Sequence, residues 1–387
     1  MRREGLGITR SLGREGIQVI GVDSSHGLAP GLKSTYCKPL LVPDPMREPS
    51  RVLKMLLEEA SKTSQDAILY PATDAYMLLT SSRRQQLEER FLFSLPSDDV
   101  VQSLIDKRRQ YKLATNLDIP CPRTYYPQTM QDVRSIGLDM EYPAIIKPRD
   151  AYSWWLVFHN KGFEVNDPEE LAEVYENVFA TRLEALIQSV VPGPDSNIYE
   201  VFVYMSRKSR PLASLVAKRI RQYPRFGHGT CLVTVHEARV LGMALDILQR
   251  IRYKGLGSVE IKRSSRDGSY VLIDVNPELQ TQSILATAAG INLPLLQYLD
   301  LTGESISQGE GYADGVKWLD AAQDFLAFCQ LNRKGRISML DWVRSILDVD
   351  CHAYFARDDF KPFLSEYASK LARFAPELVR GFSMLRA

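Results

Sequence analysis

The sequence predicts an α/β fold whose C-terminal half is α+β. Helical and strand-like segments alternate through residues 1–105, which is typical of βαβ units around a parallel sheet. A strand-rich stretch follows within residues 186–305, and its two alternating runs, 258–262 and 270–276, suit an antiparallel hairpin. The 387 residues are ample for two or three compact units that share cores.

The first unit, residues 1–105, begins with the second half of a βαβ unit. Residues 5–16 are expected to form a glycine turn, a helix and a stop, and residues 18–23 form the strand that follows. The first strand of such a unit would precede Gly5. Either the start of the protein lies upstream of Met1, or the sheet lacks that strand. A Rossmann dinucleotide site is the rival interpretation of the glycines, but a glycine pair without its preceding strand carries little information.

The later segments divide into further units. Apolar residues recur with the period of a helix or of a strand, and proline, glycine or capping residues separate the segments. The units are expected to be 1–105, 106–185, 186–305 and 306–387. In chain order we expect helices over 50–61 and 75–90, strands over 67–71 and 91–95, a helix capped by Ser97, a long helix opened by Asp167–Glu170, tail helices around 318–332 and 339–347, and a loop over 357–363.

The expected hairpin is the most informative segment. Asp267 and Gly268 lie between the two alternating runs, and this dipeptide is a strong turn signal. A three-residue loop centred on Asp267 places Glu260 directly opposite Asp274, with Asn276 on the same face of the sheet. The other face then takes the apolar side chains Val259, Ile261, Val271, Ile273 and Val275.

Two carboxylates at directly opposite positions repel each other, so this pair requires a cation. Carboxylates with an amide oxygen are hard ligands that suit Mg²⁺ bridging substrate phosphates. The alternative is a solvent-facing hairpin whose charges contact only water. Agreement among the turn, the pairing and the apolar opposite face favours the metal site, although one residue more or less in the loop would break the alignment.

These residues give the chain a resemblance to a known family. The stretch 255–262, the Asp-Gly turn and the stretch 273–277 resemble the metal hairpin of the ATP-grasp superfamily. The spacing is similar to that of carbamoyl-phosphate synthetase, and most of the chain resembles the carboxylate–amine ligases that include D-aspartate ligase. The resemblance implies an ATP-grasp fold preceded by a partial Rossmann-like pre-ATP-grasp domain. It makes 106–185 the small subdomain, 186–305 the large subdomain and 306–387 a helical extension.

The resemblance also implies roles for individual residues. In the family the hairpin holds Mg²⁺ against ATP, lysines contact the phosphates, and a hinge strand binds adenine and ribose. Glu260, Asp274 and Asn276 are thereby implied as metal ligands. The implied nucleotide contacts are Lys107, Lys147, Gln188, Ser189, Val191, Asp195 and Lys218, with Asp195 at the ribose hydroxyls. A lysine or a basic run taken alone is more often simply solvated.

The basic run 217–224 leaves two arrangements open. Alternation places Arg219 and Arg221 on one face of the expected strand and Lys218 on the other, so only one face lines the nucleotide. Arg221 and Lys218 are our catalytic candidates. They act together only if the strand ends or bulges between them.

Three features depart from the family pattern. Glu278 stands where the family usually has an arginine that stabilises charge on the transferred phosphoryl group. Ser189 stands where a glutamate is typical. Residues 149–155 replace a glycine-rich flap with a stretch that contains two tryptophans, which either cover the site or pack in a core. These departures favour a second hypothesis, a nucleotide-binding protein that keeps the fold for a regulatory or assembly role.

Composition excludes several classes of partner. The net charge of +1 gives no electrostatic case for binding nucleic acid or a membrane surface. No apolar stretch approaches the roughly 20 residues of a spanning helix, and the first residues show no signal-peptide core. The five cysteines are scattered and odd in number, which fits a reducing cytoplasm without a disulfide framework.

The sequence therefore predicts a cytoplasmic ATP-dependent ligase. ATP, with Mg²⁺ or Mn²⁺, would phosphorylate a small-molecule carboxylate. An amine, or a thiol, would then attack the acyl phosphate, so that a C–N bond forms while ADP and phosphate are released. A homodimer is an assembly that fits this interpretation. A Rossmann-type oxidoreductase is the third hypothesis, and nicotinamide-cofactor binding would support it.

Overall fold

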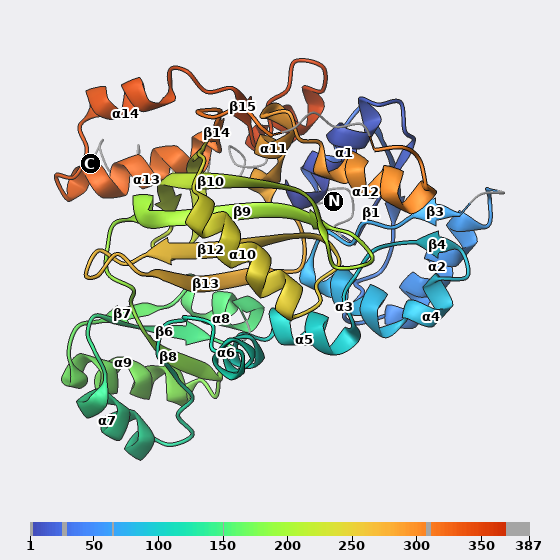
Figure 1. Cartoon of the computed structure of the whole chain (residues 1–387). Coiled ribbons are helices and arrows are strands. Elements are labelled where there is room, and N and C mark those ends of the chain that lie inside the picture. The colour runs from blue at the N-terminus through green and yellow to red at the C-terminus, as the bar shows by residue number, and fades with distance from the viewer. Residues whose placement is uncertain (1–2, 25–28, 64–65, 150, 307–310, 369–387) are drawn as a thin grey trace, which may run out of the picture.

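The computed structural model describes residues 3–24, 29–63, 66–149, 151–306 and 311–368. A large sheet lies at the centre of the molecule, with a small sheet beside it, the N-terminal elements at one end and the C-terminal helices along one edge (Figure 1).

The N-terminal elements form two small parallel sheets. Strand β1 pairs with β2, and β3 pairs with β4. Apolar side chains of α2 and α3 pack with those of β4. The elements in order are α1 (Arg3–Gly13), β1 (Val19–Asp23), the 3₁₀ helix η1 (Pro30–Lys33), β2 (Cys37–Leu41), α2 (Pro49–Ala60), β3 (Ala67–Ile68), α3 (Asp74–Ser82), α4 (Arg84–Leu87), β4 (Phe91–Leu92) and α5 (Asp98–Ile105).

Helix α1 differs from the sequence prediction. Gly5 and Gly7 lie inside this helix, so the expected glycine turn is wrong, and the rival Rossmann interpretation loses its turn. The reason is burial, because every residue from 5 to 12 is buried and Leu6 and Leu12 join the core of the large sheet. The helix expected over 75–90 is also two helices, α3 and α4.

The small sheet is antiparallel, with strand order β5-β8-β6-β7. Helices α7 and α9 cover one face, where Ala144 and Ile146 are buried, so Lys147 lies on the other face. Strand β8 belongs to this sheet, although the expected unit boundary lies between residues 185 and 186. The elements are α6 (Lys107–Asn116), β5 (Thr124–Tyr125), α7 (Met130–Asp139), β6 (Ala144–Pro148), α8 (Ala151–Phe158), β7 (Phe163–Val165), α9 (Pro168–Ala180) and β8 (Ala185–Ser189).

The two tryptophans of α8 have different surroundings. Trp154 is fully buried in the core of the small sheet, and its ring lies 4.6 Å from that of Phe158. Trp155 is 47% exposed. Of the two alternatives left open by the sequence, Trp154 therefore packs in a core.

The large sheet has strand order β13-β12-β9-β10-β11-β14-β15. Helix α10 covers one face, and α1, α11 and α12 cover part of the other (Figure 1). The elements are η2 (Asp195–Asn197), β9 (Ile198–Met205), β10 (Pro211–Tyr223), β11 (His228–Thr234), α10 (Ala238–Arg250), β12 (Gly255–Arg263), β13 (Tyr270–Asn276), η3 (Thr281–Ser283), α11 (Ile284–Ala288), α12 (Leu293–Thr302), β14 (Lys317–Leu319), α13 (Ala321–Arg333), α14 (Met339–Ile346) and β15 (Cys351–His352).

The C-terminal part is not only helical. Strands β14 and β15 extend the large sheet, and Trp318 lies in β14 within its core rather than in the expected tail helix. The loop expected over 357–363 gives way to helix from residue 361. Within the described residues no single helix is long and apolar enough to cross a membrane, and one bent pair, Thr281–Ala288 with Leu293–Thr302, meets only the length and composition criteria.

Candidate active site

The hairpin of β12 and β13 forms with the predicted pairing at its functional end. Glu260 lies opposite Asp274, and Ser258 lies opposite Asn276. Near the turn the register is shifted by one residue, because the loop is one residue longer than expected and Ile273 bulges out of β13. The bulge restores the pairing of the two carboxylates.

The same bulge changes the apolar face. Leu272 is buried in the core, in place of the expected Val271 and Ile273. The carbonyl of Ile273 instead accepts a hydrogen bond from the Tyr111 hydroxyl at 2.7 Å. Helix α6 is thereby fastened to the strand that carries Asp274.

A third carboxylate extends this row. Glu200 on β9 lies directly opposite Glu260, so three neighbouring strands place Glu200, Glu260 and Asp274 side by side. Glu200 is 1% exposed. Sequence reasoning missed it, although a lone acidic residue within the apolar strand 198–205 was the available signal.

Arg219 of β10 neutralises two of these carboxylates. Its Nε donates to Glu200 Oε1 at 2.6 Å, and its Nη2 lies 2.8 Å from Glu260 Oε2. Its Nη1 donates to Gln222 Oε1 at 2.9 Å. Arg219 is only 2% exposed, and although burial acts to lower its pKa, the charges of Glu260 and Glu200 raise that pKa overall. The guanidinium is therefore a permanent cation at the hairpin.

Two lysines, one from α6 and one from the small sheet, join the charged residues at the hairpin. Lys107, the first residue of α6, places Nζ 2.5 Å from Asp274 Oδ1. Lys147 of β6 donates to Gln188 Oε1 at 2.9 Å, and the charges of both Asp274 and Glu260 act on it. The face of the small sheet that carries Lys147 is thus turned toward the hairpin of the large sheet.

Burial sets the protonation of this site. It raises the pKa of Glu260 to about 7, although the charge of Arg219 acts in the opposite direction. It lowers the pKa of Lys147 to about 8, against the attraction of Asp274. For Lys107 burial also acts downward, but the charge and hydrogen bond of Asp274 outweigh it and raise the pKa. Shifts of this kind are typical of functional sites.

The predicted hinge lies where β8 leaves the small sheet. Gln188 is buried and its amide donates to Thr124 Oγ1 at 2.9 Å. The backbone N–H of Ser189 donates to the Arg123 carbonyl, and that of Val190 donates to the Pro143 carbonyl. Among the described residues, the N–H of Val191 makes no such hydrogen bond.

Asp195 is connected to the hairpin through hydrogen bonds. Its Oδ1 accepts from Gln222 Nε2 at 2.9 Å, and Gln222 in turn accepts from Arg219. The charge of Asp195 also acts on Lys262, whose pKa is lowered mainly by burial. The segment predicted for ribose therefore joins the carboxylate row through one glutamine.

The structure does not bring the two catalytic candidates, Lys218 and Arg221, to the hairpin. Strand β10 does bulge between Arg219 and Arg221, but Arg221 lies away from the hairpin, where its Nε and Nη2 donate to the two carboxylate oxygens of Asp324 in α13, each at 2.8 Å. Lys218 lies on the face covered by α10, with Nζ 6.0 Å from the centre of the Tyr199 ring. Arg219 is the residue of this basic run that contacts the hairpin carboxylate Glu260.

Glu278 lies two residues beyond Asn276 and is 9% exposed. Burial raises its pKa well above the usual range, and the charges of Asp74 and Glu4 act in the same direction. Surface hollows elsewhere on the small unit are lined by other residues, among them Arg108 and Arg182. The charged cluster at the hairpin is separate from them.

The donor set fits a hard divalent cation held jointly with a nucleotide. Glu260 and Asp274 present carboxylate oxygens from opposite positions, and Asn276 supplies an amide oxygen. Among the described residues no three His, Cys, Asp or Glu side chains are gathered closely enough to hold a metal by themselves. Phosphate oxygens would therefore have to complete the coordination, as is usual for Mg²⁺.

Comparisons with known proteins extend this description. No family model matches the chain. The chain is 23% identical over 303 residues to D-aspartate ligase from Enterococcus faecium (strain Aus0004), a match that covers 74% of this chain and 72% of that enzyme.

Solved structures share the architecture. An ADP complex of N5-carboxyaminoimidazole ribonucleotide synthetase superposes with a TM-score of 0.63 at 13% identity, covering 86% of this chain and 83% of that one. The biotin carboxylase domain of Hydrogenobacter thermophilus 2-oxoglutarate carboxylase, solved with MgADP, gives 0.61 at 16% identity, covering 82% and 72%. An L-amino acid ligase from Bacillus licheniformis gives 0.56 at 14% identity, covering 76% and 70%. The chain has the fold of these enzymes, and the predicted α/β class is confirmed.

Proposed function

We propose that this chain, whose fold is the ATP-grasp fold, is an ATP-dependent ligase that joins a small-molecule carboxylate to an amine. One observation carries the proposal. Glu260 and Asp274 face each other on the hairpin, and cations from three other segments, Lys107, Lys147 and Arg219, converge on them. Such a site suits a polyphosphate with its metal ion, because phosphoryl transfer depends on positioning and charge neutralisation.

Glu260, Asp274 and Asn276 would hold Mg²⁺ or Mn²⁺ in this proposal. The bound ion would supply charge neutralisation at the β- and γ-phosphates. Before ligands arrive, Lys107 and Arg219 serve as counter-ions of the same carboxylates. They keep the row from repelling itself and are already in place for the phosphates.

The nucleotide would lie between hinge and hairpin. Lys107 and Lys147 would contact phosphates, and the N–H of Val191 offers a donor for the adenine edge. Asp195 would accept from the ribose hydroxyls. We assign to Arg219, rather than Arg221 or Lys218, the stabilisation of charge on the transferred phosphoryl group, because its guanidinium lies beside Glu260.

The reaction would take place in two steps. A carboxylate oxygen of the substrate attacks the γ-phosphorus, the bond to the β-phosphate oxygen breaks, and ADP leaves. An amine nitrogen, or a thiol, then attacks the acyl carbon, phosphate leaves and the nucleophile loses its proton. The five cysteines are all free thiols, which fits a reducing cytoplasm as the place of this reaction.

One observation favours a second candidate, a nucleotide-binding protein without turnover. Glu278 puts a buried carboxyl group beside the hairpin, where the resemblance implies an arginine that would stabilise charge on the transferred phosphoryl group. This candidate keeps the nucleotide site and loses only the transfer step.

Release of ADP separates the two candidates. The protein is incubated with MgATP and a panel of amino acids and hydroxy acids, with hydroxylamine present to trap an acyl phosphate as the hydroxamate. We expect ADP and hydroxamate in equal amounts with at least one acid, and neither product without added metal. Nucleotide binding with no ADP from any acid would support the second candidate. No binding of any nucleotide would refute both.

A further inference from the structure

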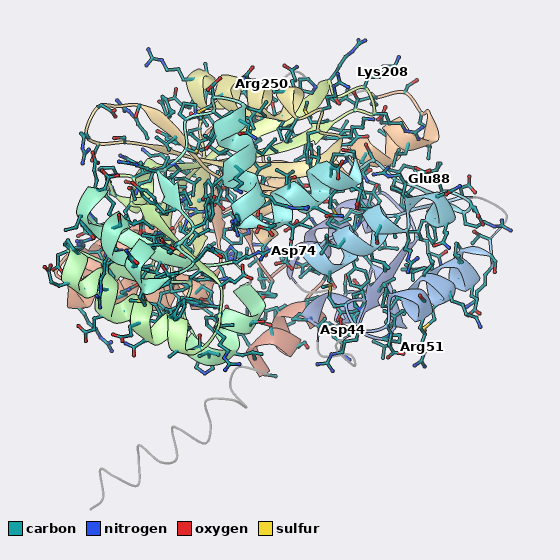
Figure 2. The ribbon with its side chains drawn as sticks, turned by 90° about the horizontal axis from the view of Figure 1, so that it is seen from below. Asp44, Arg51, Asp74, Glu88, Lys208 and Arg250 are labelled. Carbon is teal, nitrogen blue, oxygen red and sulfur yellow. The ribbon has the colours of Figure 1, made fainter. Side chains whose placement is uncertain are left out.

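Three carboxylates from distant parts of the sequence gather beside the hairpin. Glu278 follows β13, Glu4 lies in α1, and Asp74 is the first residue of α3. Asp74 and Glu4 are the charged groups that act most strongly on Glu278. Thr281, the first residue of η3 and three residues after Glu278, donates its hydroxyl to Glu4 Oε1 at 3.4 Å. Asp74 lies near the middle of the molecule when it is viewed from below (Figure 2).

Glu278 has hydrogen-bonding capacity that the protein leaves unused. The side chain is more than nine-tenths buried, with 9% of its surface exposed. Its Oε1 accepts from Gln280 Nε2 at 3.1 Å, but within the described residues its Oε2 has no partner. Glu4 Oε2 has none there either. Buried carboxylates normally find donors, so two free acceptors in groups whose charges act on each other indicate a ligand that supplies donors.

Among the described residues, the cluster also has no ion-pair partner of its own. Within the part of the chain that the structure describes, no lysine, arginine or histidine forms an ion pair with Glu4, Asp74 or Glu278. Lys107 is the cation that acts on Glu278, but its Nζ is already paired with Asp274. Among the described residues the three carboxyl groups therefore share only Lys107, which is already paired with Asp274.

The arrangement suits an ammonium group better than a metal ion. Among the described residues these carboxylates are not gathered closely enough to hold a metal. An ammonium group has three donors that point in different directions, and its hydrogen bonds to carboxylates are charge-assisted. Asp74 is exposed, Glu4 is half-buried and Glu278 is buried, so the cluster reaches from solvent inward.

We propose that Glu4, Asp74 and Glu278 form a subsite that binds a primary ammonium group of a substrate. The subsite rests on the proposed function, because its place beside Asp274 would hold that group next to the transferred phosphoryl. Two sources share this chemistry. One is the α-ammonium of an amino acid whose carboxylate is activated, and the other is the amine to which the acyl group is joined.

The first experiment distinguishes these sources by kinetics with Glu278→Gln and Asp74→Asn. In one arm, hydroxylamine traps the acyl phosphate, and aspartate, alanine and lysine are compared with their 2-hydroxy counterparts. Hydroxylamine is largely neutral near pH 7.5 and does not need the subsite. In the other arm, butylamine replaces hydroxylamine with the best acid of the panel.

We expect KM for the amino acid in the first arm, or for butylamine in the second, to rise about tenfold or more in both variants. Affinity for MgATP should stay within about twofold of the parent. Glu169→Gln, an exposed glutamate of α9, is the matched control and should change neither KM. Unchanged KM values in both arms, or an equal loss of MgATP affinity, would overturn the subsite.

A second measurement does not depend on turnover. The thermal midpoint of the nucleotide-free protein is recorded with 1,4-diaminobutane, with 1,4-butanediol and with MgCl₂ alone. The diamine should raise the midpoint of the parent and not of Glu278→Gln, and the diol should raise neither. A diamine shift without any ADP formation would refute the proposed function while supporting the subsite. Equal effects of diamine and diol, or a Mg²⁺ shift that Glu278→Gln abolishes, would refute the subsite.

Discussion

Replacing Arg219 by methionine tests the centre of the site. Arg219 is 2% exposed and contacts Glu200 and Glu260 at 2.6 and 2.8 Å, and Gln222 at 2.9 Å. Methionine fills a similar volume without charge or donors. The substitution therefore leaves two facing carboxylates on β9 and β12 without their cation.

The expected cost follows from this geometry. Removing one partner of a buried ion pair typically destabilises a protein by about 3–5 kcal/mol. Here one cation serves two carboxylates, so we expect the upper part of that range. It is a large share of the roughly 5–15 kcal/mol that holds a folded domain together. The loss should shrink at lower pH, because protonation removes the repulsion and burial already raises the pKa of Glu260 to about 7.

Arg221→Met is the matched control. Arg221 is 3% exposed and makes two contacts of 2.8 Å to the fully buried Asp324, so its removal should cost a similar amount of stability. It lies on the same strand but contacts α13 rather than the hairpin. The pair of variants therefore separates loss of stability from loss of function.

Urea unfolding, MgATP binding and ADP formation are measured on the same preparations at pH 6 and pH 8. We expect both variants to unfold at lower urea concentrations. Only Arg219→Met should lose ADP formation, by about a hundredfold or more, as when one stabilising donor of a developing charge is removed. If Arg219→Met turns over like the parent, or if folded Arg221→Met loses activity instead, the assignment of Arg219 is wrong.

Three further outcomes are expected. Asp274→Asn should keep the fold, because it relieves repulsion from Glu260, but it should lose metal-dependent ADP formation. The control Asp267→Asn, at the exposed tip of the same hairpin, should keep that activity. If Asp274→Asn forms ADP at the parental rate, the metal site is rejected. MgATP at a hundredfold excess over its dissociation constant should stabilise the protein by about 2.7 kcal/mol, and ATP with EDTA should not; a thermal-shift series measures this. Burial holds the pKa of Lys147 at about 8 in the folded protein, below its ordinary value of 10.5. Burying the charged lysine therefore lowers the stability of the protein by its full amount below pH 8, and this loss of stability is relieved as the pH rises toward 10.5. ATP affinity should fall over that same rise in pH, and Lys147→Arg, which remains charged, should bind ATP equally at both ends of it.

The hairpin was predictable because its pairing is local and its two faces differ in polarity. The resemblance to the ATP-grasp superfamily that rested on it is confirmed. The predicted pairing of Glu260 with Asp274 is correct, but through two errors that cancel. The loop is one residue longer than expected, and the bulge at Ile273 shifts the register back. Alternation alone does not reveal a bulge, because the extra residue has no signature of its own.

The remaining site residues depend on contacts between distant segments. Arg219 and Arg221 are equivalent under strict alternation, and only the bulge in β10 and the position of Asp324 separate them. Likewise, Gly5 and Gly7 of α1 were predicted to form a turn, because nothing nearby in the sequence shows that this helix is buried on all sides. The neighbours of an element depend on the tertiary fold, and burial against those neighbours can also override the local pattern, as it does in α1.

The two sides of the site differ in the charge of their side chains. On the side of β6, α6 and β10, the cations Lys107, Lys147 and Arg219 face the carboxylate row, and a metal ion taking over those carboxylates would leave the three cations free to contact phosphate oxygens. On the side of α1 and α3, no cation among the described residues forms an ion pair with Glu4, Asp74 or Glu278. A triphosphate is attracted to the first side and repelled by the second, and an ammonium group has the opposite preference. Asp274 lies between the two sides, since it pairs with Lys107 and also acts on Glu278. The substrate carboxylate, whose oxygen would attack the γ-phosphorus and whose carbon the amine would then attack, would have to lie at this boundary, where the two substrates meet.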